Sequence, residues 1–386
     1  MSKLDKLIKE LCPNGVEYKK LCDISTISRG DRITKKDLMD NGKFPVISGG
    51  ILPMGRYSQK NRNANTITIS SYGAAGYVGF ITEDFWANDV CLSIFPHKEV
   101  ENKYLYYTLT TLQNYIYGNT TKAIPDHIPT KFLEDLQIPV PPLPVQREIV
   151  RILDNFTELT AELTAELTAR KKQYEYYRDE LLAPNEEIPM VRLKDIATDF
   201  FRGSGIKREQ VTDDGISCVR YGEIYTTYNT WFDKCVSHTK LDYVQSPKYF
   251  EYSDILFAIT GESVEDIAKS VAYVGHEKCL AGGDIVVMKH KQNPKYLAHV
   301  LSTTLAREQK SKGKVKSKVV HSNVPSIEQI EIPLPSLDVQ ERYANILDNF
   351  ESLCNDISNG LPAEIKARQK QYEYYRDKLL NFKEAT

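Results

Sequence analysis

Two long stretches of the chain carry the hydrophobic stripe of an amphipathic helix. In residues 145–182, apolar side chains recur every three or four positions with Arg and Glu between them, which is the spacing of one helix face. The preceding PVPPLP cannot be helical, because proline lacks an amide hydrogen and restricts the residue before it. We therefore predict a helix that begins near Val145 and spans about 57 Å over 38 residues. The second stretch covers about 339–380.

Both stretches belong to an internal repeat. Residues 139–156, PVPPLPVQREIVRILDNF, recur at 333–350 as PLPSLDVQERYANILDNF, a separation of 194 residues. QYEYYRDELL at 173–182 recurs at 371–380 as QYEYYRDKLL, a separation of 198. The chain is therefore a tandem duplication whose second copy is four residues longer between these segments.

The middle of the helix differs between the copies. The first copy carries a four-residue unit twice, Thr160–Leu163 and Thr164–Leu167, which would act as a length module. At the corresponding place the second copy has Asn359, Gly360, Leu361 and Pro362. A glycine followed two residues later by proline is typical of a helix end and a restart. We predict that the second helix is broken or kinked there.

Neither helix can bury its own stripe, so we predict that the two pair as an antiparallel coiled coil. The alternative is that each packs on its own globular neighbour. The identity of the two QYEYYRD segments extends to other helix faces, which favours either two equivalent docking surfaces for another protein or a recent duplication. The candidates for helix pairing or partner docking are Leu153, Phe156, Leu163, Leu167, Tyr174, Tyr177, Arg178, Leu347, Phe350, Tyr372, Tyr375 and Arg376.

A weaker echo concerns the ends of the chain. LCPN at 11–14 resembles LAPN at 182–185, so a short N-terminal helix ends as the helix of the first repeat does. The two termini should then lie at equivalent points of a two-fold-related body. We predict that they are close in space.

Two globular segments alternate with the helices and differ from each other far more than the helices do. Each mixes short β-branched or aromatic runs with turn residues. A helix follows in each, at about 101–116 and 294–309. We predict an α+β fold with a twisted, partly open sheet and four segments, 1–144, 145–185, 186–338 and 339–386. The predicted strand runs are 44–48, 65–70, 76–81 and 90–95 in the first copy, and 217–228, 254–260, 270–275 and 284–289 in the second.

Composition excludes several classes of protein. The 386 residues allow two or three domains, and 41% apolar with 26% charged residues is ordinary globular usage. No run approaches 18 apolar residues and the N-terminus lacks an apolar block, so we expect a cytoplasmic protein without a membrane span. Seven scattered cysteines without a CxxC pair indicate neither a disulfide framework nor a zinc site.

The net charge of −2 predicts no overall affinity for nucleic acid, so any such binding would need local patches or a partner. KSKGKVKSK at 310–318 concentrates lysines around a glycine, where phosphate contact and plain solvation are both possible. The first copy holds only Lys122 there, but His127 matches His321 at the repeat separation. The glycines of 70–79 would let backbone approach a ligand, or could form a tight hairpin.

The familiar catalytic motifs are missing. GxxxxGK[ST] and GxGxxG do not occur, which excludes a P-loop nucleotidase and gives no support for a dinucleotide site. NPKY at 293–296 only faintly resembles a methyltransferase loop, and the ExK of Glu364 and Lys366 lies on a predicted helix with no strand aspartate near it. We predict neither catalytic residues nor a metal site.

Taken together, the chain resembles the specificity subunit of type I restriction and modification systems. The resemblance covers nearly the whole chain: two divergent heads, each followed by PxPPLxxQ or its close variant and a long helix with the ILDNF and QYEYYRD signatures. The duplicated TAEL unit looks like the spacer repeat of one branch of that family. The resemblance implies a subunit that is not an enzyme on its own, with two globular target-recognition domains in a pseudo-two-fold tandem repeat.

The resemblance also implies the partners. Double-stranded DNA, two methyltransferase subunits and restriction or translocase subunits are expected, with S-adenosylmethionine, ATP and Mg²⁺ on those partners and no cofactor on this chain. Each head would read one half of an asymmetric bipartite target. The candidate DNA-binding residues are Ser48, Gly49, Gly50, Ser70, Ser71, Tyr72, Gly73, Lys122 and His127 in the first copy, and Arg220, Tyr221, Thr260, Gly261, Glu262, Lys312, Lys314, Lys316, Lys318 and His321 in the second.

Two alternatives remain at this point. The chain could be the specificity module of another type of restriction system, which would work with a different catalytic partner. It could also be a coiled-coil scaffold without DNA function, although a scaffold leaves the two divergent heads unexplained.

Overall fold

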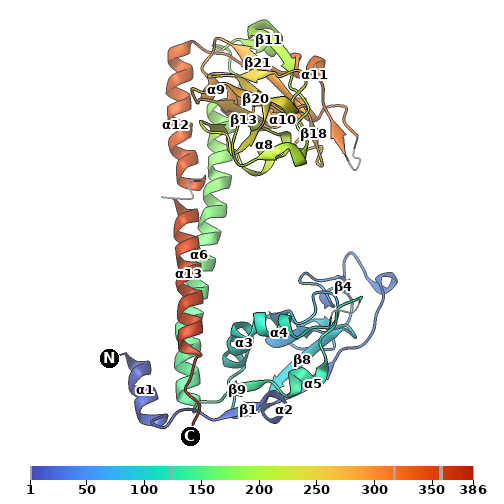
Figure 1. The fold of residues 1–386 in the computed structure, drawn as a ribbon, viewed down its shortest axis with the longest axis vertical. Coiled ribbons are helices and arrows are strands. Elements are labelled where there is room, and N and C mark those ends of the chain that lie inside the picture. The colour runs from blue at the N-terminus through green and yellow to red at the C-terminus, as the bar shows by residue number, and fades with distance from the viewer. Residues whose placement is uncertain (1, 122–123, 316–318, 356–359, 386) are drawn as a thin grey trace. The chain divides into compact units, whose positions relative to one another are not determined.

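The computed structural model describes residues 2–121, 124–315, 319–355 and 360–385. They form two compact units (Figure 1). Unit 1 comprises Met1–Glu162 and Ile365–Thr386, and unit 2 comprises Leu163–Glu364. Each unit therefore contains one globular part together with portions of the long helices.

The globular part of unit 1 contains a four-stranded antiparallel sheet of order β2-β8-β5-β6, a three-stranded sheet of order β4-β3-β7, and the pair β1-β9. Its elements are α1 (Lys3–Leu11), β1 (Tyr18–Lys20), α2 (Leu21–Ile24), β2 (Ser25–Arg29), η1 (Lys35–Asp37), β3 (Phe44–Ile47), β4 (Gly55–Tyr57), β5 (Thr66–Ser70), β6 (Val78–Ile81), β7 (Trp86–Ala87), β8 (Cys91–Pro96), α3 (Asn102–Thr111), α4 (Gln113–Gly118), α5 (Thr130–Glu134) and β9 (Gln137–Pro139).

The globular part of unit 2 contains two five-stranded sheets, of orders β11-β21-β17-β19-β14 and β12-β15-β13-β20-β16, and the pairs β10-β23 and β18-β22. Its elements are β10 (Met190–Arg192), α7 (Leu193–Ile196), β11 (Ala197–Arg202), η2 (Arg208–Gln210), β12 (Val211–Thr212), β13 (Ile216–Val219), α8 (Tyr221–Thr226), β14 (Trp231–Phe232), β15 (Ser237–Thr239), η3 (Leu241–Tyr243), β16 (Tyr249–Phe250), β17 (Ile255–Ala258), β18 (Thr260–Gly261), β19 (Ser270–Tyr273), β20 (Cys279–Ala281), β21 (Ile285–His290), α9 (Pro294–Val300), α10 (Thr304–Ser311), β22 (Val320–His321), α11 (Val324–Glu328) and β23 (Glu331–Pro333).

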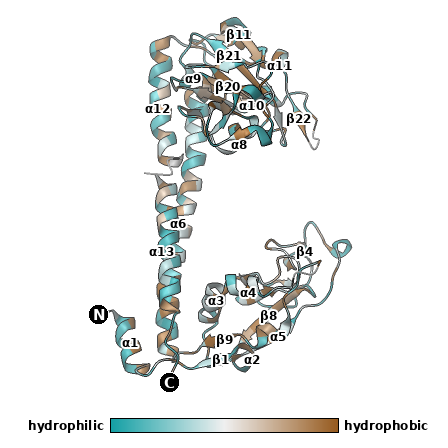
Figure 2. Cartoon of the chain, viewed as in Figure 1, coloured by the Kyte–Doolittle hydropathy of each residue, from teal (hydrophilic) through white to brown (hydrophobic). Residues whose placement is uncertain are grey.

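Strand register confirms that the two globular parts share one plan. β9 pairs with β1 and β23 with β10, with Pro139 and Pro333 at equivalent positions of the two ladders. Pro96 of β8 and His290 of β21 face the first residues of β2 and β11. Both comparisons keep the separation of 194 residues found in the sequence. The central strand of unit 1, β5, is buried along its whole length, and the sheets stand out as hydrophobic in Figure 2.

Two predictions for the globular parts need correction. The run 217–228 is a strand only as far as Val219, and Tyr221–Thr226 form α8 instead. A carboxylate oxygen of Glu223 accepts from the amide of Arg220 at 3.2 Å, which caps the first turn of that helix. The single helices predicted at 101–116 and 294–309 are each two helices, the second pair being separated where Thr303 caps α10.

The long helices start and stop close to the predicted places. α6 covers Leu143–Leu181, so it begins two residues before Val145, because Pro144 lies in the first turn, where its missing amide hydrogen is not required. The second helix is two helices, α12 (Leu337–Asn355) and α13 (Leu361–Leu379), which confirms the predicted break. Residues 356–359 lie outside the described part of the chain.

Helix pairing is antiparallel within each unit (Figure 1). In unit 1, Phe156 of α6 stacks on Tyr375 of α13 with ring centroids 5.4 Å apart. In unit 2, Phe350 of α12 lies 6.3 Å from Tyr177 of α6. The helices also pack on the globular parts, since Leu153 and Leu347 are buried in the cores of units 1 and 2. Both predicted modes of burying the stripes therefore occur together.

The glutamine that ends both PxPPLxxQ-like motifs forms hydrogen bonds between the long helix and the globular part of the same unit. The side-chain oxygen of Gln146 accepts from the amide of Glu101 at 2.7 Å, and that of Gln340 accepts from the amide of Asn293 at 3.0 Å. Both glutamines are buried. The repeat signature thus marks the point where a new helix is anchored to the helix α3 or α9 of its own unit.

The two ends of the chain meet in unit 1. The amide of Val16 donates to the carbonyl of Lys383 at 2.9 Å, and the amide of Ala385 donates to the carbonyl of Val16 at 3.0 Å. The hydroxyl of Tyr18 donates to the carbonyl of Phe382 at 2.9 Å. The predicted proximity of the termini is confirmed.

Two further findings concern the chain as a whole. Among the described helices, none combines the length and the apolar character needed to cross a bilayer. The cysteines whose side chains are described are free thiols, namely Cys12, Cys22, Cys91, Cys218, Cys235 and Cys279.

Candidate nucleic-acid interface

Two loops predicted as DNA contacts meet at the end of β5 in unit 1. The amide of Ala74 donates to the carbonyl of Gly49 at 2.7 Å, and a Cβ on Gly49 would lie 2.4 Å from the carbonyl oxygen of Tyr72. Gly73 has a φ of +80°, which favours glycine. The loop also closes the β5-β6 hairpin, since the amide of Ser70 donates to the carbonyl of Tyr77 at 3.0 Å. The glycines therefore serve both the hairpin and the contact between loops.

The serines of these loops correct the predicted interface. Ser70 and Ser71 are buried, and the hydroxyl of Ser71 donates to the carbonyl of Val90 at 3.0 Å. Their hydroxyls face the protein because the loop folds back on β8. Gly50 is exposed and Ser48 is half-buried, so these remain at the accessible side of the loop pair.

His127 joins the two loops through Tyr72. The rings of Tyr72 and His127 stack with centroids 5.3 Å apart, and the two residues form a β-bridge. The Nδ1 atom of His127 lies 2.8 Å from the hydroxyl of Thr121, which fixes the orientation of the ring. Tyr72 is partly exposed, so a flat aromatic surface is presented beside the polar loops, as base or sugar stacking would require.

Unit 2 repeats this arrangement with different chemistry. Thr260 of β18 pairs with His321 of β22, and its hydroxyl lies 3.2 Å from Nδ1 of His321. The next residue, Gly261, approaches Tyr225 of α8 so closely that a Cβ would lie 2.8 Å from the tyrosine hydroxyl. Glu262 follows and is exposed.

Tyr72 and Thr260 occupy equivalent positions. Ile67 of β5 pairs with Ile94, and Ile255 of β17 pairs with the residue 194 positions after Ile94. Tyr72 and Thr260 each follow these isoleucines by five residues, and each faces a histidine at the same repeat separation. Within each unit, the structure thus places the predicted residues at equivalent backbone positions. We call this arrangement the loop frame, and the side chain that faces its histidine differs between the units.

A groove beside Arg220 and Tyr221 adds residues that the sequence did not single out. It has a volume of about 700 Å³, and Lys207, Arg208 and several glycine backbones line it. Arg220 is tied to the buried Glu223, with its Nε atom 3.1 Å from the carboxylate. Lys207 is exposed and forms no ion pair with another described residue. The run GSGIKRE at 203–209 could have indicated this groove from the sequence, because basic residues follow two glycines there.

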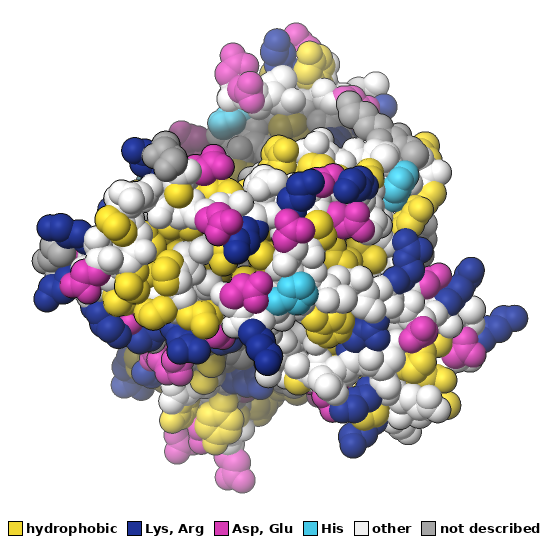
Figure 3. Space-filling view, turned by 90° about the horizontal axis from the view of Figure 1, so that it is seen from below, with side chains coloured by type: hydrophobic (Ala, Val, Ile, Leu, Met, Phe, Trp, Pro, Cys, Tyr) yellow, Lys and Arg dark blue, Asp and Glu magenta, His cyan; other side chains and the backbone are white. Residues whose placement is uncertain are grey.

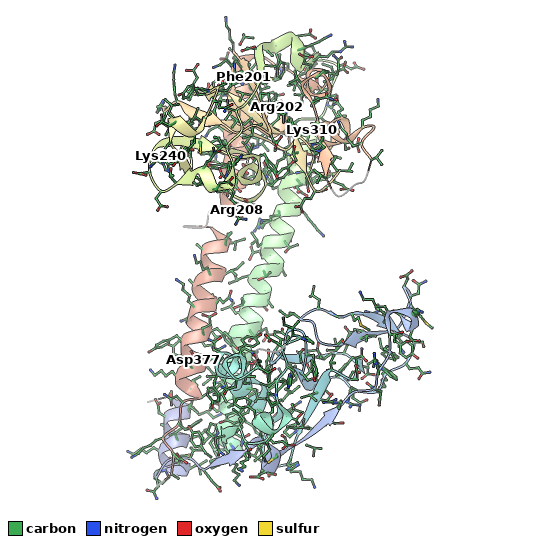
Figure 4. All side chains as sticks on the ribbon, turned by 45° about the vertical axis from the view of Figure 1, so that its right-hand side comes forward. Phe201, Arg202, Arg208, Lys240, Lys310 and Asp377 are labelled. Carbon is green, nitrogen blue, oxygen red and sulfur yellow. The ribbon has the colours of Figure 1, made fainter. Side chains whose placement is uncertain are left out.

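The lysine-rich segment divides into buried and exposed parts. Lys310 is buried, and its ammonium donates to the hydroxyl of Ser270 at 3.0 Å and the carbonyl of Leu301 at 2.8 Å (Figure 4). Burial lowers the pKa of Lys310 to about 7. Lys312 is exposed and Lys314 is half-buried. The predicted contacts Lys122, Lys316 and Lys318 lie outside the described residues.

The helix-pairing candidates separate into two groups. Tyr372 contacts Tyr107 in unit 1, and Leu163 and Leu167 are half-buried in unit 2. Arg178 is 3% exposed and pairs with Asp179, whose carboxylate accepts from the hydroxyl of Thr304. Arg178 is therefore a structural residue of unit 2 and not an exposed docking residue. Arg376 is half-buried beside Asp377.

A buried polar cluster in unit 2 brings together His299, Asp348 and Glu351, whose donor atoms lie within 4.8 Å of one another. Nε2 of His299 lies 2.8 Å from Asp348, which also accepts from Lys295 at 2.7 Å. Nδ1 of His299 lies 3.0 Å from the hydroxyl of Tyr174. The ammonium of Lys295 already supplies the positive charge that a metal ion would bring to Asp348. We therefore interpret the cluster as a hydrogen-bond network that joins α6, α9 and α12.

Charges of both signs are interspersed on the face of Figure 3, in keeping with 50 basic and 52 acidic residues. This pattern lacks the single-sign field that drives non-specific binding to nucleic acid. A site here would depend on the loops and groove described above.

Comparison with known proteins assigns the chain to a family. The model of the type I restriction modification DNA specificity domain matches residues 13–170 and again 185–367. The chain belongs to this family. Its two matches correspond to the two copies of the repeat. A putative type I restriction enzyme specificity subunit of Haemophilus influenzae is 30% identical, with 98% of each chain covered.

One further relative and two solved structures are also similar to this chain. The EcoR124I/EcoR124II specificity subunit of Escherichia coli is 30% identical over 99% of this chain and 97% of its own length. The S subunit of a type I restriction-modification system from M. genitalium has a TM-score of 0.56, with 95% of this chain and 96% of that chain covered, at 17% identity. A structure from work on assembly of the type I system reaches a TM-score of 0.61 at 13% identity, covering 96% and 98%. At such identities these structures confirm the fold alone.

Proposed function

We propose that this specificity-family chain reads DNA, each globular part recognising one half of an asymmetric bipartite target. The observation that carries the proposal is the shared loop frame of the two units. Both place a residue that closely follows the central strand against a histidine, but one unit uses Tyr72 and the other Thr260. Two copies of one frame with different side chains are suited to reading two different sequences.

The near-neutral chain would not hold DNA by charge alone, so partners complete the proposal. Methyltransferase subunits, two in number, would supply S-adenosylmethionine and adenine methylation. Restriction or translocase subunits would supply ATP- and Mg²⁺-dependent cleavage. In this assembly the chain itself performs no chemistry, and its helices set the separation of the half-sites. The cytoplasm is where such an assembly would meet DNA.

The direct test is methylome mapping. The chain would be co-expressed with the methyltransferase subunit encoded beside it, and methylated adenines would be mapped by long-read sequencing. We expect a split, asymmetric motif with one methylated adenine in each half. A stable complex that methylates nothing would contradict the proposal and favour a scaffold, and an unsplit motif would favour the specificity module of another restriction type.

Matched variants assign the halves. Tyr72→Ala should relax or abolish recognition of one half-site only, and Thr260→Ala should do so for the other. Tyr176→Ala, an exposed tyrosine of α6, is the control and should leave both halves unchanged. If Tyr72→Ala and Thr260→Ala altered neither half, the loop frame would not be the reading surface.

The duplicated Thr160–Leu163 and Thr164–Leu167 units give a second test. One more TAEL unit adds about 6 Å of helix, against about 3.4 Å per base pair. The gap between half-sites should grow by one or two base pairs while both half-sites stay the same. Altered half-site letters would contradict the proposed length module.

A further inference from the structure

Unit 2 contains a pocket where α8, α10 and the start of β19 come together. It has a volume of about 320 Å³, which is near the lower end of the range for small-molecule sites. Basic, hydroxyl and apolar side chains share its walls. Those that matter for its chemistry are Tyr225, Ile267, Lys269, Ser270, Arg307 and Lys310.

The most buried basic group of the pocket is Lys310 of α10, which is 5% exposed. Its ammonium donates to the hydroxyl of Ser270 at 3.0 Å and to the carbonyl of Leu301 at 2.8 Å (Figure 4). Both acceptors are uncharged, and an ammonium has a third hydrogen to donate. No described carboxylate forms an ion pair with Lys310. Burial is the main cause of its lowered pKa of about 7, and the charges of Arg307 and Lys269 are the further causes.

Two more basic side chains line the same pocket. The ammonium of Lys269 donates to the carbonyls of Tyr225 and Tyr228, each at 3.4 Å, and burial lowers its pKa. Arg307 precedes Lys310 by three residues on α10, so the two lie on one helix face. Arg307 is exposed. The pocket therefore offers basic groups both at its buried end and toward solvent.

The carboxylates near the pocket lie on its exposed side. Glu265 and Asp266 are both exposed, and Glu265 accepts from the hydroxyl of Ser263 at 2.6 Å. The charges of Asp266 and of Glu351 on α12 favour the ammonium of Lys269, but burial prevails and its pKa stays lowered. Neither charge is among the causes that act on Lys310. The buried end of the pocket is therefore positive without a counter-ion among the described residues.

The same place in unit 1 is uncharged. Strand pairing relates Val78 of β6 to Ser270 of β19, since these residues face the equivalent positions Ile69 of β5 and Phe257 of β17. The separation of 194 residues relates α4 to α10. The counterparts of Lys269, Ser270, Arg307 and Lys310 are thus Tyr77, Val78, Gln113 and Ile116.

These counterparts fill the space in unit 1. Val78 and Ile116 are buried in its hydrophobic core. The side chain of Gln113 accepts from the amide of Val78 at 2.9 Å and donates to the carbonyl of Gly76 at 2.7 Å. The shared fold is therefore compatible with an apolar residue at the position of Lys310. A buried ammonium there costs free energy, and a bound anion would offset that cost.

We propose that this pocket of unit 2 binds a phosphate dianion, either free or as the terminal group of a small metabolite, held by Lys310, Lys269 and Arg307. Three basic groups suit a dianion better than a single carboxylate, and the guanidinium fork matches phosphate oxygens. Tyr225 and Ile267 offer an apolar wall to the remainder of a metabolite. An internal phosphate of DNA carries one charge and a sugar on each side, so it does not fit a binding group as buried as Lys310.

Binding is coupled to a proton. A dianion beside Lys310 favours the ammonium, so the bound ligand raises the pKa of Lys310. In the free pocket the amine loses its proton as pH rises through about 7. Affinity for a dianion therefore falls as pH rises above 7, until the pKa of the bound state is reached.

The test titrates the full chain with sulfate, inorganic phosphate and adenosine 5′-monophosphate. Sulfate remains a dianion across the pH range, so any pH dependence of its binding belongs to the protein. Calorimetry at pH 6 and pH 8 gives the affinities, and NMR of isotope-labelled lysine follows the titration of Lys310, whose signal is the one missing in Lys310→Met. Sulfate should bind about tenfold more weakly at pH 8 and should raise the pKa of Lys310 by about 1 or more.

Variants separate the basic groups. Lys310→Met should weaken all three ligands about tenfold or more at pH 6 and remove the pH dependence of sulfate binding. Arg307→Gln, which installs the residue type of unit 1, should weaken binding but keep the pH dependence. Lys312→Met, an exposed change outside the pocket, is the control and should alter neither.

The two sources of phosphate give different results. Tighter binding of adenosine 5′-monophosphate than of inorganic phosphate would support a metabolite that also contacts the apolar wall. Equal affinities would support free phosphate.

Three outcomes would overturn the inference. These are no binding of any of the three ligands at pH 6, binding that Lys310→Met leaves intact, and displacement of bound sulfate by a DNA duplex but not by adenosine 5′-monophosphate. The site does not rest on the proposed reading of DNA, so methylome mapping and these titrations can fail separately.

Discussion

The junction between helix and globule uses the same positions in the two units but different chemistry. In unit 1, Asp154 is partly exposed and accepts from the hydroxyl of Tyr107 at 2.6 Å and the ammonium of Lys103 at 2.8 Å. In unit 2 the corresponding Asp348 is more deeply placed and accepts from His299, Lys295 and Trp231. The backbone plan is kept, while unit 2 buries a larger polar network.

The difference shows how a buried carboxylate is tolerated. Burial alone would raise the pKa of Asp348, but the hydrogen bonds and charges of His299 and Lys295 lower it overall. Each partner of the carboxylate therefore matters more in unit 2 than in unit 1.

The largest effect is expected from removing the buried acceptor. Asp348→Ala leaves His299, Lys295 and Trp231 without their shared partner, which costs about 3–5 kcal/mol of local stability for a buried pair. Asp154→Ala, at a more exposed junction, should cost about 1–2 kcal/mol. Native-state hydrogen exchange of α9 and α3 would measure the two losses in the intact chain. Equal losses would contradict the contrast between the junctions.

The second prediction uses the buried lysine of unit 2. Lys310 stands where unit 1 has the buried Ile116, 194 residues earlier. Because burial lowers the pKa of Lys310 to about 7, the unfolded chain binds the proton more tightly between about pH 7 and 10. Stability should therefore rise with pH in that window, by up to ~1.4 kcal/mol per unit.

Lys310→Met should remove this rise, as measured by denaturant unfolding of unit 2 at pH 6, 8 and 9.5. Lys312→Met, at an exposed neighbour, is the control and should keep it. A rise that persists without Lys310 would assign the pH dependence to another group.

The third prediction concerns the loop frame of unit 1. Gly49→Ala places a Cβ 2.4 Å from a backbone oxygen of Tyr72, so the two loops must separate, at about 1–3 kcal/mol. Gly50→Ala is the matched control, since the nearest atom to its Cβ is 3.4 Å away. Hydrogen exchange of residues 70–76 should rise for the first variant only. Protection that is unchanged by Gly49→Ala would mean that the loops adapt without separating.

The smallest effect concerns the ion pair between Lys3 of α1 and Glu148 of α6. Hydrogen bonds from Arg151 and Lys3 lower the pKa of Glu148 to about 2. The stabilisation from this lowered pKa is complete above the ordinary pKa of about 4.5 and is lost as pH falls toward 2. Spin-label distances between residues 6 and 383, both in unit 1, should broaden over that window. Glu148→Gln should show the broadened distribution already at neutral pH.

The sequence determined much of the architecture by itself. A repeated stripe, a repeated proline-rich entry and a separation of 194 residues establish two copies and their helices, and the Gly360 and Pro362 pair predicts the helix start at Leu361. These features are local or periodic, so a single chain displays them without knowledge of contacts. The divergence of the two globular parts and the family resemblance can also be read from the sequence without knowledge of contacts, and they indicated the function.

Tertiary structure alone decided which side chains remain available. Ser70, Ser71, Arg178 and Lys310 carry polar groups that suggest surface roles, yet the fold buries all four. The partners of Ser71 and Lys310, Val90 and Ser270, are distant in sequence. The groove beside Lys207 and the pairing of Tyr72 with His127 also join separated segments. Burial depends on where the chain returns in space, and the local pattern of residues does not record that return.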